Sequence, residues 1–136
     1  MITVVAVLLI LSLIYLPRLA SNTQGIMDTR KSLHLLASDL RYTRRLAMTA
    51  STNYKLQIST DTTPVTYQIL RASDSAQVDT PREIPSTVAA SGATAVTFVA
   101  TGGATTNSTV TLTGPRNTYN VIVFSATGST QIQKVR

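Results

Sequence analysis

The side chains that could do catalytic or metal chemistry are few and widely spaced. His34 is the only histidine, and the chain has no cysteine. Histidine and thiolate metal sites need several ligands at short spacing, and no such spacing occurs. Asp74 and Asp79 share one expected loop, but paired carboxylates do acid–base work only in a pocket, which nothing here indicates. We therefore expect no enzyme, no metal and no cofactor, an exposed or helix-packed His34, and solvated acidic groups.

The basic residues indicate possible binding surfaces more clearly than the acidic residues do. Twelve lysines and arginines face six acids, which gives a formal net charge of +6. One cluster comprises Arg41, Arg44 and Arg45, and a second could gather Arg116, Lys134 and Arg136 at one end of a sheet. Such clusters attract phosphates, lipid head groups or acidic proteins. Ordinary surface charge is the alternative.

These residues must be positioned by a chain that begins with an apolar segment, Met1 to Leu16, followed by Pro17. A helix of that length spans roughly 24 Å, which is short of the roughly 30 Å of a bilayer core. Candidate membrane or filament-core residues are Val4, Val5, Val7, Leu8, Leu9, Ile10, Leu11, Leu13, Ile14, Leu16 and Pro17. A cleavable signal peptide and a soluble core helix remain alternatives.

An amphipathic helix is expected to follow, with a kink at Pro17 and a bend or local melting between Ala20 and Gly25. Its apolar stripe repeats every seven residues and packs on the rest of the chain. Before Leu33, a neighbouring subunit is the expected partner. The stripe comprises Leu19, Ile26, Leu33, Leu36, Leu40, Thr43, Ala47 and Ala50.

The pattern of the rest of the chain predicts β-strands. Alternating apolar residues predict strands around residues 54–58, 65–69, 96–98, 110–112, 121–124 and 131–135. Ala72 to Ser91 is expected to be a long loop or an irregular crossing, and residues 126–129 a turn that closes a final hairpin. The fold class is α+β, a long N-terminal helix packed on a small antiparallel sheet. Expected divisions are residues 1–17, 18–52 and 53–136.

The first seventeen residues, MITVVAVLLILSLIYLP, resemble the interior of the type IV pilin signature. The leader, the glycine before the peptidase cut and the signature glutamate of that family are not in this sequence. The resemblance implies a longer chain, and about six further residues would bring the helix to bilayer-spanning length.

A second segment, LASDLRYTRRLAMTASTNYKLQI from Leu36 to Ile58, resembles the helix-to-strand junction of GspH/FimT-type minor pilins and pseudopilins. Asp39, Leu40, Arg44 or Arg45, and Ala47 carry the match. The resemblance implies a non-enzymatic subunit of a type IV pilus or type II secretion filament. It also implies a bacterial inner-membrane, single-pass anchor with a periplasmic head, and other pilins as partners.

Two further roles follow from the same resemblance. In the FimT branch a basic C-terminal region binds DNA during uptake, which would assign that role to Lys134, Arg136 and Arg116. Against this, no aromatic residue interleaves the C-terminal basic residues as a stacking platform. A major structural subunit of a pilus is the other alternative.

Overall fold

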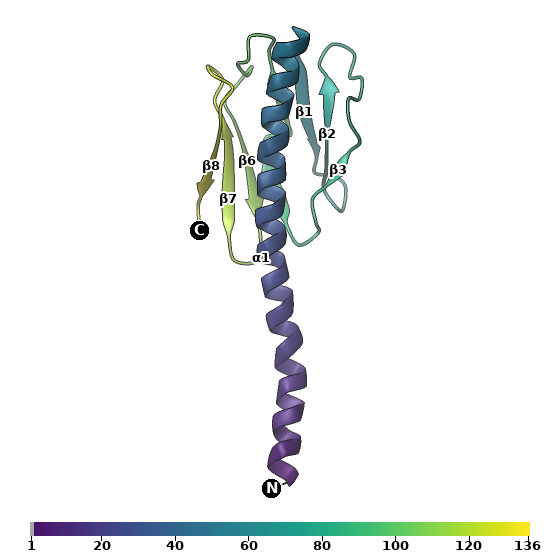
Figure 1. Ribbon diagram of the computed structural model, residues 1–136, viewed down its shortest axis with the longest axis vertical. Helices are drawn as coiled ribbons and strands as arrows, with labels where there is room; N and C mark the ends of the chain where they lie inside the picture. The colour runs from purple at the N-terminus through teal and green to yellow at the C-terminus, as the bar shows by residue number, and fades with distance from the viewer. Residues whose placement is uncertain (1) are drawn as a thin grey trace.

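The chain folds into one long helix with a head of two β-sheets at its C-terminal half (Figure 1). The computed structural model describes residues 2–136, except for the side chains of residues 13–22. The elements are α1 (Ile2–Ala50), β1 (Tyr54–Ser59), β2 (Thr66–Arg71), β3 (Arg82–Glu83), β4 (Ala89–Gly92), β5 (Ala95–Phe98), β6 (Ser108–Thr113), β7 (Thr118–Val123) and β8 (Thr130–Lys134). We call residues 2–22 of α1 the stem.

Helix α1 runs without interruption through Pro17 and Gly25. The local melting expected between Ala20 and Gly25 is therefore wrong. Gly25 is buried, because the head covers the helix at this point and compensates for the poor helix propensity of glycine. The helix ends where Ser51 adopts a left-handed conformation (φ 49°) and the Thr52 amide donates to the Ala47 carbonyl, the pattern that caps many helices.

Each sheet has four antiparallel strands. Their orders are β3-β2-β1-β5 and β4-β6-β7-β8. Buried and less buried residues alternate along β1, β6 and β7, as the sequence predicted. The final hairpin is confirmed, with Val121 opposite Ile132 and a turn through Gly128.

The loop expected over Ala72 to Ser91 is a partial error, because β3 and the start of β4 lie within it. Both strands are short and largely exposed, so they carry no apolar alternation that a sequence pattern could reveal. Gly92 explains why β4 and β5 belong to different sheets. Its φ of +97° suits glycine, and a Cβ atom there would collide with the Thr109 carbonyl, so the chain can turn from one sheet to the other.

The core lies between α1 and both sheets. The helix contributes Leu33, Leu36, Leu40 and Ala47, as the stripe predicted, together with Thr43. Ile26 is only half-buried, Ala50 is exposed, and the side chain of Leu19 lies outside the described residues. The largest fully buried residues from the strands are Leu56, Val96, Phe98, Val110, Leu112, Val121 and Val123.

Candidate functional site: an exposed stem and the face of its helix

The described side chains of the stem are uncovered. Exposed fractions are 62% for Val4, 59% for Leu8 and 57% for Ile10, with the other large apolar residues from Ile2 to Leu11 between 46% and 87%. Of the candidate core residues, Leu13, Ile14, Leu16 and Pro17 have side chains outside the described part. Among the helical residues that the structure describes, none form a stretch with the length and apolarity needed to cross a membrane.

The head closes on the helix at Gly25. A Cβ atom on this residue would lie 2.5 Å from Cγ of Pro115, and one on Gly114 would collide with the Thr29 hydroxyl. Thr29 is fully buried and donates to the Gly25 carbonyl at 2.7 Å. The expectation that the helix leans on another subunit before Leu33 is therefore wrong for Gly25 and Thr29. The turn between β6 and β7 covers them, because small residues let it approach.

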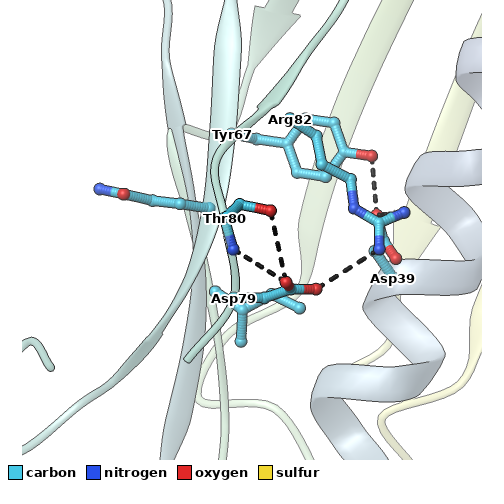
Figure 2. A pocket seen from close by; sticks show the side chains of 7 residues that line it. Asp39, Tyr67, Asp79, Thr80 and Arg82 are labelled. Atoms are coloured by element: carbon cyan, nitrogen blue, oxygen red, sulfur yellow. Dashed lines mark hydrogen bonds and ion pairs between the residues drawn. The ribbon is translucent and has the colours of Figure 1, made fainter. Parts of the chain in front are cut away.

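One acid of the helix points into the head, as Figure 2 shows. The Tyr67 hydroxyl donates to Oδ2 of Asp39 at 2.7 Å, and Nη1 of Arg82 lies 3.3 Å from the same oxygen. The Asp39 side chain is only 7% exposed. The expectation of solvated acids is therefore wrong for Asp39. The second resemblance placed this residue correctly on the helix, but it gave the carboxylate no partner on the strands.

The same cluster continues outward to the loop after β2. Nη2 of Arg82 lies 3.4 Å from Oδ2 of Asp79, whose other oxygen accepts the Thr80 amide at 2.8 Å. Burial, followed by the hydrogen bond to the Asp39 carboxylate, raises the pKa of Tyr67 far above its ordinary value of 10.0. The phenol therefore remains a donor, and the cluster fixes α1 to β2 and β3.

The helix arginines separate into two kinds. Nε of Arg44 donates to the Gly102 carbonyl at 2.8 Å, so this residue ties the helix to the loop after β5. Arg41 and Arg45 are exposed, and their side chains make no ion pair or hydrogen bond within the part of the chain that the structure describes. The predicted cluster of three therefore contains one structural residue and two free charges. His34 is also exposed on this helix.

The C-terminal basic residues are partly brought together. Arg116 and Arg136 line one open hollow of about 590 Å³, beside Gly114 and Pro115. Lys134 is exposed and lies opposite Tyr119 across the β7–β8 hairpin. Since Pro115 packs on Gly25, and the C-terminus lies at the lower part of the head in Figure 1, this cluster faces the stem and not the far tip.

Comparison with solved structures identifies the architecture. The minor pseudopilin EpsH from the type 2 secretion system of Vibrio cholerae matches with a TM-score of 0.64 at 13% identity, over 79% of this chain and 97% of that one. The type IV minor pilin FimU of Pseudomonas aeruginosa matches in two crystal forms, each with a TM-score of 0.61. In these, identity is 19% and 14%, over 76% and 87% of this chain and 91% and 92% of those chains.

The fold is type IV pilin-like. No family model and no curated protein matches the sequence. At such identities the shared fold is what the comparison establishes, and it agrees with the fold expected from the two resemblances.

Within this pilin-like fold, sequence reasoning missed two features of the helix–head contact. Gly25 and Thr29 are small residues one turn apart, which permits close approach on one helix face. Asp39 follows Leu36 by three residues and precedes Thr43 by four, so its spacing already placed it on the buried face. Both signals were present in the printed sequence.

Proposed function

We propose that the chain is a non-enzymatic filament subunit of the minor pilin or pseudopilin kind. The observation that carries this is the set of uncovered apolar side chains from Ile2 to Leu11, in the same continuous helix that is docked in the head. Surface of this kind is stable in water only when another apolar surface covers it, at about 25 cal/mol per Å² buried. Before assembly, the stem would be held in the bacterial inner membrane, with the head in the periplasm. After assembly, stems of other pilins would cover it.

Cross-linking between stems tests this role, because the chain has no cysteine of its own. We expect Leu8→Cys to give stem-to-stem adducts with other pilins that carry a cysteine at the matching stem position, in cells that assemble the filament. Ser73→Cys, an exposed position in the loop after β2, is the matched control and should give none at the same reagent length. If Leu8→Cys stayed unlinked while filaments formed, stem packing would be excluded as the mode of assembly.

A second candidate function, DNA binding, is favoured by the hollow between Arg116 and Arg136, with Lys134 close by in the hairpin. Several exposed cations on one surface would neutralise phosphates and give affinity that falls with salt. Since this surface faces the stem, DNA would lie along the side of a filament and not across its tip.

Duplex binding by the full chain in neutral detergent micelles tests that candidate. Lys134→Ala/Arg136→Ala should lower the slope of log affinity against log salt by about 2. Lys55→Ala/Arg71→Ala removes the same charge from the sheet of β1 and β2 and should change the slope much less. Equal slopes for the two variants would show that DNA affinity depends only on the net charge of the chain and that this surface is not a DNA-binding site.

A further inference from the structure

The outward face of α1 alongside the head carries a row of basic side chains. At 3.6 residues per turn, Arg30, His34, Arg41 and Arg45 fall within about 60° of one another around the helix and span about 22 Å. All four are exposed, as is Lys31 beside them. Figure 1 shows that the sheets lie on one side of α1 and leave the opposite side open. We call Arg30, Lys31, His34, Arg41 and Arg45 the basic stripe.

The charged members of the basic stripe have no partner within the described side chains. The side chains of Arg30, Lys31, Arg41 and Arg45 make none of the ion pairs or hydrogen bonds found in the described part of the chain. Arg44, on the same helix segment, is instead committed to the Gly102 carbonyl. The arginines that serve the fold are therefore distinct from those that face outward.

A second copy of this chain has little acidic surface to offer the stripe. Asp39 and Asp79 are paired with Arg82, Asp74 is paired with Arg71, and Asp28 accepts a hydrogen bond from Thr87. Asp61 and Glu83 are the remaining acids, and residues 84–136 contain none. Two copies brought together at their stripes would repel each other, so the complementary surface must belong to a different chain.

The surroundings of the stripe suit a protein partner better than a nucleic acid. Tyr42 and Met48 are 44% and 41% exposed on the same segment of the helix, and Met27, just before the stripe, is 67% exposed. Aromatic residues, methionine and arginine together are enriched in protein interfaces. A nucleic-acid surface would need only the charges.

We propose that the basic stripe docks the acidic face of a neighbouring filament subunit of different sequence. The inference rests on the proposed function, because a neighbour whose stem packs beside this one brings its own surface alongside the same helix. Charge complementarity would select the partner and speed its arrival, more than it would add affinity. The chain would then occupy a position next to an unlike subunit and would not form a homopolymer.

The experiment uses the full chain in neutral detergent micelles, with a labelled poly-L-glutamate peptide as the probe. Arg41→Gln/Arg45→Gln should weaken probe binding about tenfold at about 0.1 M salt, where the Debye length is about 10 Å, since two exposed charge contacts are lost. Gln131→Glu/Gln133→Glu lowers the net charge by the same two units on exposed positions of β8 and should weaken it less than threefold, as the long-range effect of net charge is screened. Equal losses would overturn the proposal.

Two further arms separate the alternatives. A DNA duplex that binds more tightly than poly-L-glutamate, and is lost in Arg41→Gln/Arg45→Gln, would show that the stripe recognises nucleic acid and would overturn a protein partner. Ser38→Cys lies on the stripe face and should give no adduct between two copies of this chain in cells that assemble filaments; a homodimeric adduct would also overturn the proposal. Failure of the stem cross-link with an intact probe difference would instead exclude stem packing as the mode of assembly and leave the acidic preference of the basic stripe standing.

Discussion

The carboxylate of Asp39 lies between the phenol of Tyr67 and the guanidinium of Arg82, and one oxygen serves both contacts. Three elements, α1, β2 and β3, meet at this atom. Removing Asp39 leaves the buried Tyr67 hydroxyl without its acceptor, and removing Tyr67 or Arg82 leaves the buried carboxylate with one partner of two. Each loss costs more than the contact itself contributes.

Tyr67→Phe isolates one contact of this cluster. The ring still fills its place, but Asp39 loses its shortest hydrogen bond, so we expect the free energy of unfolding to fall by about 1–3 kcal/mol. Urea denaturation of the full chain in neutral detergent measures the change. Tyr42→Phe, an exposed tyrosine on the same helix, is the control and should be neutral. A neutral Tyr67→Phe would mean that Arg82 alone satisfies Asp39.

The alkaline behaviour of the same residue gives a second prediction. Burial first, and then the bond to Asp39, raise the pKa of Tyr67 in the folded chain above 10.0. The unfolded phenol therefore ionises before the folded one, so stability is full below pH 10 and is lost as the pH rises beyond it, by up to about 1.4 kcal/mol per unit. Tyr67→Phe should make the decline between pH 9 and 11 shallower, whereas Tyr42→Phe should not.

At the scale of elements, the contact between α1 and the β6–β7 turn depends on two glycines, Gly25 of the helix and Gly114 of the turn. Gly25→Ala improves helix propensity by about 1 kcal/mol. Its Cβ atom would nevertheless lie 2.5 Å from Cγ of Pro115, so the variant should melt at a lower temperature. Gln24→Ala, on an exposed position one residue earlier, is the control and should melt no lower than the parent.

A double-mutant cycle locates the cause. Pro115→Ala removes Cγ and Cδ, the two nearest atoms, so the combination with Gly25→Ala should recover most of the loss. Additive losses in thermal melts would show that the glycine matters for a reason other than this contact.

Elements with a strong apolar period were predictable from the sequence. Seven-residue spacing correctly placed Leu33, Leu40 and Ala47 on the buried face, and alternation located β1, β6 and β7. The short exposed strands β3 and β4 carry no such period, so they could not be found. Partners across the fold, such as Tyr67 and Arg82 for Asp39, depend on how distant segments meet, which local spacing does not encode.

At the scale of the whole molecule, the head extends further down the helix than its strands suggest. Gly25 is the first buried residue of α1 among those whose burial the structure describes. A chain starting at Thr23 should therefore keep the unfolding midpoint of the head in the full chain. A chain starting at Leu33 loses the contacts of Gly25 and Thr29 and should melt lower, by about 4–8 °C for each kcal/mol lost. Calorimetry of the two truncated chains compares them, and equal midpoints would show that these contacts add no stability.

The single helix also determines how the molecule would respond to force. Its buried positions, from Gly25 to Ala47, are spread over about 33 Å along one axis. A pull on the stem directed along that axis loads these contacts in shear, all at the same moment, because the helix would have to slide past both sheets. A sideways pull at the Ala50 end would peel them apart one turn at a time. In the filament role that we propose, the molecule would therefore resist force best along the filament axis, the direction in which a fibre under tension would pull on it.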